Sequence, residues 1–483
     1  MARILVTHGY FYRLDPKQWA DGRPYPPLGT LLAAAVLREA GHEVGVFDTG
    51  LLHSPEELAS GLERVKPQIL VVWDDGFNYL TKMCLTVMRD ASKRMIAMGK
   101  QAGCHVVVNG SDASDHPEEY LAAGADAVAL GEGEPTLKEL VERWEQGSAW
   151  TDLPGLAYLQ GEALRTTPKR PVLRDLDSLP LPAWDLVDLA PYRARWRTSQ
   201  GRFSLNMATT RGCPYKCNWC AKPIYGNRYN SRSPEHVVRE LELLLAGPAP
   251  DHIWFADDIF GLKPGWVQRF RDLLRERGLR IRYKVQSRVD LLLENDTIDA
   301  LVASGLEEVW VGAESGSQRV LDAMDKGTTV EQIAQATRLL KSKGVRVCFF
   351  LQFGYLGETQ AEVESTIRMV EELMPDDIGV SVSYPLPGTK FHELVKADLV
   401  GKANWTDSDD LAMMFRNRQR PAYYKRLHRY VHKRYRRRQA MLALQGKLRA
   451  SRLRRLLAGL YYVPATAIES LRLKWLGSAK AWA

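Results

Sequence analysis

Three cysteines that fall within eight positions are the residues best placed to carry chemistry. They lie in the segment Arg211-Gly-Cys213-Pro-Tyr-Lys-Cys217-Asn-Trp-Cys220, whose spacing is C-x3-C-x2-C. Thiolates select soft metals and iron–sulfur clusters. Three cysteines on one short loop can bind three irons of a [4Fe–4S] cube and leave the fourth iron open to an exogenous ligand. A zinc site completed by a histidine such as His236, or three inert thiols, are the alternatives.

The composition excludes several classes of protein. The chain has 483 residues, 45% of them hydrophobic, which suggests about two to four domains. No apolar run reaches the ~18 residues that a spanning helix needs, and the opening Met-Ala-Arg precedes too short an apolar run for a signal peptide. Six cysteines are few for this length and favour a reducing compartment. We therefore expect a cytoplasmic protein, and we interpret Cys84, Cys104 and Cys348 as core thiols.

Two series of alternating strands and helices must position the cysteine loop. In residues 1–147, five short apolar runs alternate with helix-period stretches, which predicts a doubly wound parallel sheet whose ligands sit beyond the carboxyl ends of the strands. The five predicted strands are Ile4–Thr7, Val44–Phe47, Ile69–Trp73, Val106–Val108 and Ala127–Leu130. Residues 148–200 are punctuated by prolines and are interpreted as a linker.

The second series covers residues 201–395 and predicts a partial (β/α)6, TIM-like barrel, so the fold class is α/β. Its six predicted strands are Leu205–Thr209, Ile253–Ala256, Ile281–Val285, Val309–Gly312, Val345–Phe353 and Ile378–Tyr384. The cysteine loop directly follows the first of them. Barrel enzymes carry their chemistry at the carboxyl ends of strands, so this placement favours an active cluster over inert thiols.

The C-terminal region, residues 396–483, is basic and is predicted to be helical from Trp405 onward. Sixteen Lys and Arg residues and no acid lie between Arg416 and Arg455, while Tyr424, Leu427, Val431 and Tyr435 form one apolar stripe. Three interpretations stay open. The region could cap the barrel mouth, or it could dock at the inner face of an anionic membrane with the help of the apolar segment 456–463. Nucleic-acid binding is disfavoured because no RNA-binding fold is recognisable.

The cysteine motif, with the aromatic Trp219 before its last cysteine, resembles the radical S-adenosylmethionine (SAM) superfamily, and the whole chain resembles its cobalamin-binding class. The resemblance implies a [4Fe–4S] cluster on Cys213, Cys217 and Cys220, with Trp219 packing near SAM. It also implies SAM contacts at later strand ends: Asp257 and Asp258 at the amino group, Gln286 and Arg288 at the carboxylate, Glu314 and Ser315 near the ribose, and the turn with Pro387 and Gly388.

The N-terminal part is similar to the B12 domain of that class through Pro26-Pro-Leu-Gly29, the segment ending at Gly110, and Gly131-Glu-Gly-Glu134. The resemblance implies cobalamin contacts at the strand ends: Gly9, Asn109, Gly110, Ser111, Gly131, Glu132 and Gly133. The D-x-H-x-x-G motif of methionine-synthase-type domains does not occur, and Asp115-His116 has the wrong spacing for it. We therefore expect base-off cobalamin with no protein histidine on the cobalt.

The resemblance implies an enzyme that forms a 5′-deoxyadenosyl radical and methylates an unactivated carbon of a small-molecule or lipid-like substrate. Its expected partner is an electron donor of the flavodoxin or ferredoxin type. A cobalamin-dependent cyclase or rearrangement enzyme that transfers no methyl group is one alternative, and a non-catalytic cobalamin sensor is another. A methylthiotransferase is disfavoured, because that family carries three N-terminal cysteines and only two precede residue 200 here.

Overall fold

The chain forms two compact units in a computed structural model that describes residues 1–220, 224–402, 404–445 and 452–478. Unit 1 comprises Met1–Pro214, Lys222–Val285 and Asn404–Asp410. Unit 2 comprises Tyr215–Ala221, Gln286–Ala403 and Leu411–Ala483. The division falls within the cysteine motif, so Cys213 belongs to unit 1, and Cys217 and Cys220 belong to unit 2.

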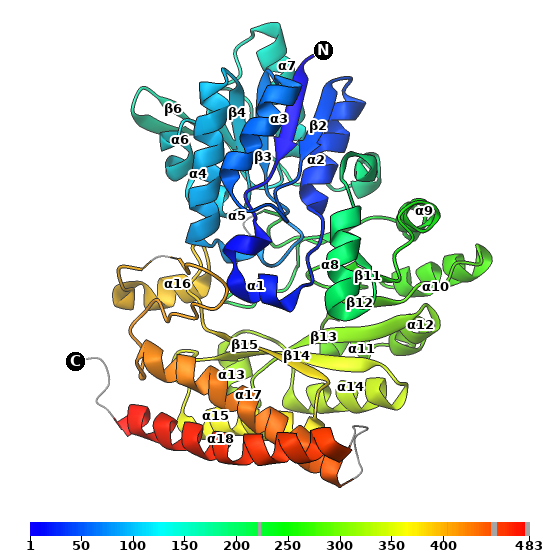
Figure 1. Ribbon diagram of the computed structural model, residues 1–483, viewed down its shortest axis with the longest axis vertical. Coiled ribbons are helices and arrows are strands. Elements are labelled where there is room, and N and C mark those ends of the chain that lie inside the picture. Colours follow the sequence, from blue (N-terminus) through cyan, green and yellow to red (C-terminus); the bar gives the residue numbers. More distant parts are fainter. Residues whose placement is uncertain (221–223, 403, 446–451, 479–483) are drawn as a thin grey trace. The chain divides into compact units, whose positions relative to one another are not determined.

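The first sheet, in unit 1, has seven strands in the order β2-β1-β3-β4-β5-β6-β7 (blue to cyan in Figure 1). The first five strands in this order are parallel, and the last two are antiparallel. The strands are β1 (Arg3–Thr7), β2 (Glu43–Phe47), β3 (Ile69–Trp73), β4 (His105–Asn109), β5 (Ala127–Ala129), β6 (Leu156–Gln160) and β7 (Ala163–Thr166). The order 2-1-3-4-5 confirms the predicted doubly wound sheet.

Helices cover both faces of this sheet. They are α1 (Pro16–Asp21), α2 (Leu28–Glu39), α3 (Leu58–Val65), α4 (Thr86–Gln101), α5 (Ser111–Asp115), α6 (Pro117–Ala122) and α7 (Glu134–Gln146). Ten consecutive residues of α2 are buried, and α2 and α7 share one apolar core cluster with the sheet. This burial of apolar area is the main force that holds the sheet and its helices together.

The predicted linker is partly regular structure. Strands β6 and β7 form a hairpin that extends the first sheet through the pairing of β5 with β6. Helix α8 (Ala190–Gln200) follows and buries Tyr192 and Trp196. The hairpin escaped prediction because its second strand is wholly exposed, so it lacks the apolar alternation that marks a half-buried strand.

The second sheet has six strands in the order β15-β14-β13-β12-β11-β8, which is the half-barrel expected from the sequence. The strands are β8 (Ser204–Met207), β11 (His252–Phe255), β12 (Tyr283–Ser287), β13 (Leu306–Glu314), β14 (Arg346–Phe353) and β15 (Asp377–Val382). A separate two-stranded sheet pairs β9 (Thr210–Arg211) with β10 (Asn230–Ser231).

The helices of this half of the chain alternate with the strands, and some of them begin at a side-chain cap. They are α9 (Pro234–Ala246), α10 (Trp266–Glu276), α11 (Val289–Leu292), α12 (Thr297–Ala303), α13 (Gln318–Ala323), α14 (Val330–Ser342), α15 (Gln360–Leu373) and α16 (Lys390–Val395). Ser233 accepts a hydrogen bond from the His236 amide at the start of α9, as Ser233-Pro234 predicts. Thr329 forms a capping box with Gln332 at the start of α14.

In the C-terminal region, the first long helix begins further along the chain than expected. Residues 404–420 contain no helix, and helix α17 (Pro421–Leu444) begins at a proline. In the stretch after Trp405, the carboxylate of Asp410 accepts from the Thr406 amide and that of Asp407 accepts from the Asp409 amide, which favours turns over a helix. The predicted stripe of Tyr424, Leu427, Val431 and Tyr435 is buried.

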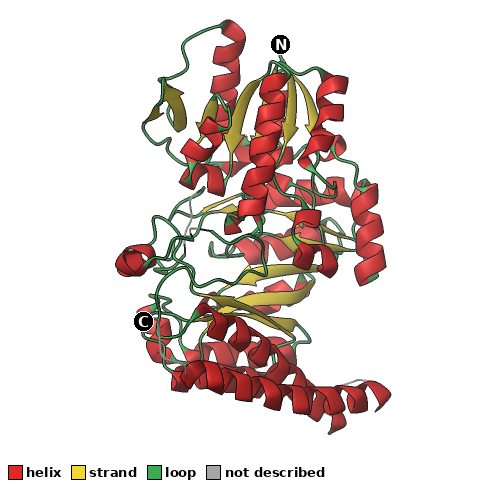
Figure 2. Cartoon of the chain, turned by 60° about the vertical axis from the view of Figure 1, so that its left-hand side comes forward, coloured by secondary structure: helices red, strands yellow, loops and turns green. Residues whose placement is uncertain are grey.

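Helix α17 packs along α15 and the edge strand β15, and helix α18 (Arg452–Ser478) packs along α17 (Figure 2). Arg434 of α17 binds Glu364 and Glu371 of α15, which neutralises part of the basic run. Residues 446–451 of that run lie outside the described residues. Within the described part of the chain, no helix is both long enough and apolar enough to cross a membrane.

One buried acid of unit 2 predicts a pH-dependent stability. Glu358, in the loop between β14 and α15, accepts a hydrogen bond from the Gly354 amide (2.6 Å), and burial raises its pKa to about 8. In the unfolded chain this carboxyl titrates near 4.5, so the folded state holds its proton more tightly. Stability that is present at low pH is therefore lost as the pH rises from about 5 to about 8.

The variant Glu358→Gln keeps a neutral side chain at every pH. Between pH 6 and pH 9, the free energy of unfolding of this variant should rise relative to that of the wild type by at most about 3 kcal/mol. Urea unfolding at the two pH values measures the difference, with the exposed Glu372→Gln as a matched control. A pH-independent difference between Glu358→Gln and the wild type would contradict the prediction.

Candidate active site

The cysteine loop begins after β9 at a glycine in the left-handed backbone conformation. Gly212 has a φ of 75°, and a Cβ there would come within 2.1 Å of the Arg228 carbonyl oxygen, so only glycine fits this turn. Cys213 is buried, Cys217 and Cys220 are half-buried, and none of the three is in a disulfide. Among the described residues, no three His, Cys, Asp or Glu side chains are grouped around a common metal position.

Arg211, which precedes that glycine, lies in a buried ion cluster within unit 1. Its guanidinium donates to Glu132 (2.5 Å) and to both carboxylate oxygens of Glu134 (2.7 and 3.2 Å). All three side chains are at most 4% exposed. Burial raises the pKa of Glu132 despite the pull of Arg211. The cluster therefore ties the start of the cysteine loop to the turn between β5 and α7.

Asn218, inside the motif, holds the loop in unit 2. Its side-chain amide donates to the Ala323 carbonyl (2.7 Å) and to Asp325 (3.2 Å), and its side-chain oxygen accepts from the Tyr355 hydroxyl (3.0 Å). Its backbone N–H donates to the Met324 carbonyl at 3.0 Å. A buried amide with this many partners fixes the backbone between Cys217 and Cys220.

The two acids predicted at the end of β11 have different surroundings. Asp257 is buried, and its oxygens accept from the Thr209 and Thr210 amides (2.7 and 2.8 Å) and from the Thr209 hydroxyl (2.6 Å). Burial raises its pKa to about 6, although these hydrogen bonds lower it. Asp257 thus holds the turn that leads to the cysteines. Asp258 is more exposed and pairs with Lys82 (2.7 Å).

In unit 2, Glu314 and Lys326 form a buried pair at the end of β13. The ammonium of Lys326 lies 2.8 Å from Glu314 and 6.0 Å from the ring centre of Trp219. Burial would lower the pKa of Lys326, but Glu314 and the nearby Cys217 outweigh it and raise that pKa. A β-bulge between Gly312 and Glu314 and the φ of 55° at Glu314 direct this acid out of the ladder register.

The remaining predicted SAM contacts are distributed over three loops. Arg288 is buried, bonds Asp290 (2.8 and 3.0 Å) and stacks 3.7 Å over the Tyr215 ring. Gln286, two residues earlier, is half-buried. The Ser315 hydroxyl is 3.1 Å from that of Thr366 on α15. Pro387 and Gly388 are exposed in the turn before α16, and the φ of Gly388 is 74°.

The predicted cobalamin contacts gather at the carboxyl edge of the first sheet. Asn109 donates to the Ala129 and Gly131 carbonyls (2.8 and 3.0 Å) and so joins the ends of β4 and β5. A Cβ would come within 2.0 Å of Ser92 at Gly9, within 2.8 Å of Asp74 at Gly110 and within 2.7 Å of Trp73 at Gly133. The Ser111 hydroxyl is buried without a hydrogen-bond partner among the described residues.

Two carboxylates at the same edge, Asp74 and Asp75, were not predicted. Asp74 accepts from the Gly9 amide (2.8 Å), and burial raises its pKa to about 6. One oxygen of Asp75 accepts from the Gly29 amide (3.0 Å), and the other has no partner among the described residues. The sequence could have indicated these two residues, because two acids directly follow the wholly apolar strand that ends at Trp73.

The histidine at the end of β1 is engaged with protein groups. The Nε2 atom of His8 is 2.9 Å from Asp48, which also accepts from the Tyr192 hydroxyl (2.7 Å). Burial of Asp48 acts to raise the pKa of this carboxyl, but its hydrogen bond to His8 and the electrostatic attraction of His8 outweigh burial and lower that pKa. His8 is thereby fixed in the wall of the sheet edge.

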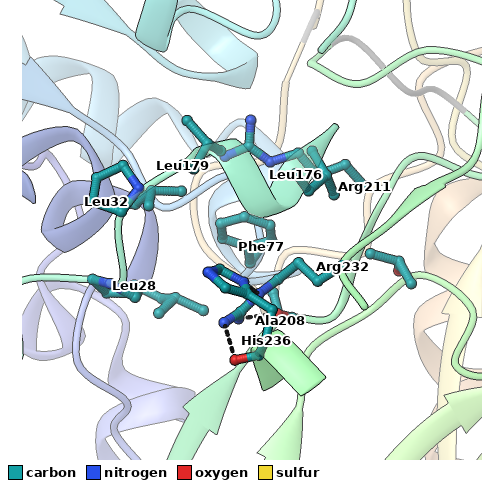
Figure 3. A pocket seen from close by; sticks show the side chains of 12 residues that line it. Leu28, Leu32, Phe77, Leu176, Leu179, Ala208, Arg211, Arg232 and His236 are labelled. Carbon is teal, nitrogen blue, oxygen red and sulfur yellow. Dashed lines mark hydrogen bonds between the residues drawn. The ribbon is translucent and has the colours of Figure 1, made fainter. Parts of the chain in front are cut away.

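An apolar pocket lies within unit 1, beside the end of β8 (Figure 3). It leaves about 390 Å³ of space, part of it open to solvent. Its apolar lining comes from α2, from the segment after β3 and from the segment after β7: Leu28, Leu32, Phe77, Leu176, Leu179, Pro180 and Pro182. Arg232 and His236 supply the polar side, where the Arg232 Nε donates to the His236 Nδ1 (2.9 Å).

Two family models match the chain. That of the radical SAM superfamily matches residues 207–370, and that of the B12 binding domain matches residues 22–141. These ranges contain the cysteine motif and most of the glycine-rich strand ends described above.

Individual proteins are similar over most of the chain. An uncharacterized methyltransferase (PH0819) of Pyrococcus horikoshii is 31% identical over 80% of this chain and 82% of its own length. An anaerobic magnesium-protoporphyrin IX monomethyl ester cyclase of Cereibacter sphaeroides is 27% identical over 77% of this chain and 60% of its own. A solved structure of the radical SAM methyltransferase TsrM from Kitasatospora setae, with cobalamin and a [4Fe–4S] cluster bound, superposes with a TM-score of 0.68 at 20% identity, over 82% of this chain and 75% of the other.

Proposed function

Because the chain belongs to the cobalamin-binding class of the radical SAM superfamily, we propose that it methylates an unactivated carbon of a small-molecule or lipid-like substrate. Family membership confirms the α/β fold with a half-barrel and the cofactor set predicted from the sequence, namely a [4Fe–4S] cluster, SAM and cobalamin. The domain boundaries and the roles of single residues stay predictions.

The observation that carries the proposal is the set of three cysteines, none of them in a disulfide, on a loop fixed by Arg211 and Asn218. Cys213, Cys217 and Cys220 would hold the cluster, and the donor set suits it because iron–sulfur clusters are bound by thiolates. The bound cofactors supply a carbon radical that removes hydrogen and a methyl group that replaces it. The protein's own residues hold these groups in place and exclude water.

We assign the polar strand ends of unit 2 to SAM. Arg288 is suited by charge to the methionine carboxylate, and Glu314, held by Lys326, is suited to the ribose hydroxyls. Asp257 has both oxygens engaged by Thr209 and Thr210, so we assign it to positioning the cysteine loop rather than to direct contact with SAM.

We assign the glycine-lined edge of the first sheet to the corrin. Gly9, Gly110 and Gly133 leave room where any side chain would collide, and the unpartnered oxygen of Asp75 and hydroxyl of Ser111 offer hydrogen bonds to amide groups of a ligand. His8 is bound to Asp48, which supports the expectation that no protein histidine ligates the cobalt. The spectrum of bound cob(II)alamin tests this: nitrogen hyperfine splitting from an axial imidazole would contradict it.

The pocket of Figure 3 is the candidate substrate site. Its leucines and prolines favour an apolar group of a substrate, and the side chains of Arg232 and His236 would orient a polar group beside it. Burial lowers the pKa of His236, and the neighbouring Arg232 lowers it further. The imidazole is therefore neutral at pH 7, and the charge of Arg232 is balanced by the buried Glu240, 2.5 Å away.

Isotope tracing with the reconstituted, anaerobic protein tests the proposal. With SAM labelled in its methyl group, we expect transfer of the label to the bound corrinoid, release of S-adenosylhomocysteine, and a labelled product in an extract of small molecules and lipids. The readouts on the corrinoid need no known substrate. An external reductant of the flavodoxin or ferredoxin type is the proposed electron donor, and a chemical reductant serves as the control.

The similarity to a cyclase supports one second candidate, oxidative ring formation without methyl transfer. The same experiment separates the two. A cyclase forms 5′-deoxyadenosine without S-adenosylhomocysteine and without label in the product, and that result would overturn the methyltransferase proposal.

The hydrogen bonds of Asn218 predict a graded loss of cluster. In Asn218→Ala, the amide contacts to Ala323 and Tyr355 are lost, and the loop is no longer fixed. We expect the affinity for iron to fall about 10–100-fold, as for the partners that orient metal ligands elsewhere, measured by iron and sulfide content after dialysis against a chelator. Asn404→Ala is the matched control, because Asn404 is equally buried and donates to Cys84 and Asp112 (2.6 and 3.2 Å). Equal iron loss in both variants would contradict the prediction.

A further inference from the structure

Helix α18 presents two opposite faces within unit 2. Its inner face is packed on α17: Thr466, Glu469 and Leu473 are buried, and Glu469 accepts from Arg426 (3.1 Å) and Lys433 (2.9 Å) of α17. These ion pairs fix the rotation of α18 about its own axis. The residues that point away from α17 are therefore defined by the helical period.

The outer face of α18 is an exposed apolar stripe. Most of its members are three or four positions apart along the sequence. Because each residue of an α-helix turns the chain by about 100°, these side chains all lie on one side of the helix. We define the α18 stripe as Leu457, Leu460, Tyr461, Pro464, Ile468, Leu471 and Trp475. Leu460 and Trp475 are each 73% exposed, and Leu471 is 67% exposed. Large side chains this exposed in a row mark an interaction surface.

Helices α17 and α18 and the segment between them are rich in Lys and Arg. Residues 421–478 contain fifteen Lys and Arg residues and a single acid, Glu469, which is buried on the inner face. Arg472 and Lys474 are exposed and lie on either side of the stripe. The stripe spans about 27 Å at 1.5 Å per residue, so it is long enough to lie along a surface over several turns.

We infer that α18 lies on an anionic lipid bilayer, with the α18 stripe entering the boundary between headgroups and acyl chains. An apolar face flanked by cations, with an aromatic residue at one end, is the pattern of helices that bind in the plane of a membrane. A second copy of this chain is a poorer occupant, because it would bring two strongly basic surfaces together. The inference does not depend on the proposed reaction, since it concerns binding alone.

Flotation of the full-length protein with lipid vesicles tests the inference. We expect the wild type to float with phosphatidylcholine vesicles that contain about 30% of the anionic lipid phosphatidylglycerol. It should not float with vesicles of phosphatidylcholine alone. In Leu460→Glu/Leu471→Glu the bound fraction should fall at least about tenfold. Leu243→Glu/Leu339→Glu changes two exposed leucines on α9 and α14 and should leave binding unchanged. Circular dichroism verifies that each variant keeps its helix content.

A second variant gives an independent readout. Arg472→Gln/Lys474→Gln should bind anionic vesicles more weakly and with a shallower salt dependence, because it removes charge and keeps the apolar stripe. Equal binding to neutral and anionic vesicles, or equal binding of the stripe variant and the wild type, would overturn the inference. So would a wild-type dimer that binds no vesicles and dissociates in the stripe variant, since that result assigns the stripe to a second copy.

Discussion

Replacement of Cys213, Cys217 and Cys220 with alanine is expected to remove the bound iron and to abolish formation of 5′-deoxyadenosine from SAM. As proposed, each thiolate would bind one iron of the cluster, and alanine offers no ligand. Cys217 and Cys220 are only half-buried, so alanine at these positions leaves little empty space, and the variant should fold. Iron and sulfide analysis after anaerobic reconstitution measures the first effect, and chromatography of the SAM cleavage products measures the second.

The control removes two other thiols. Cys84 and Cys104 are buried, and burial raises the pKa of both, as expected for thiols that bind no metal. Cys84→Ala/Cys104→Ala should keep the wild-type iron content. If the triple variant retains iron, or if the wild type reconstituted without oxygen holds zinc instead, the radical mechanism fails.

The strands could be predicted because their burial is encoded locally. Runs such as Leu-Val-Val in β3 are apolar at every position, since a parallel sheet covered on both faces has no polar side. The same logic missed the β6–β7 hairpin, whose second strand is exposed. The same reasoning made the predicted β13 too short at its start. The strand begins at Leu306, but Glu307 and Glu308 follow at once, and two charged residues in a row indicate an exposed segment rather than a buried strand.

The candidate cluster ligands could be picked out because their spacing is local in the sequence, whereas the residues that hold their loop could not. Arg211 meets Glu132 across 79 positions of the chain, and Asn218 meets Ala323 across 105. No periodicity or motif links groups so far apart, and each pair is created only when sheet and loop have folded. The polar end of β3, by contrast, was visible in the sequence as two acids after an apolar strand.

Removal of the charge at Arg211 is expected to have the largest effect on stability. Arg211→Met leaves Glu132 and Glu134 buried with no cation, and breaking a buried ion pair in this way costs about 3–5 kcal/mol. The guanidinium also lies 5.1 Å from the ring centre of Tyr225, a packing contact that methionine replaces only in part. Urea unfolding followed by tryptophan fluorescence measures the loss, which should appear even without cofactors.

Two comparisons separate charge from packing in this prediction. In Arg211→Met/Glu132→Gln/Glu134→Gln no buried charge is left unpaired, so much of the lost stability should return. Arg38→Met breaks a pair with similar geometry (2.6 and 3.1 Å to Asp185), but both partners are exposed, and the change should be at most about 1 kcal/mol. If Arg211→Met costs no more than Arg38→Met, the buried cluster does not hold the cysteine loop. A large loss that the triple variant fails to recover would instead assign the role of Arg211 to its packing against Tyr225.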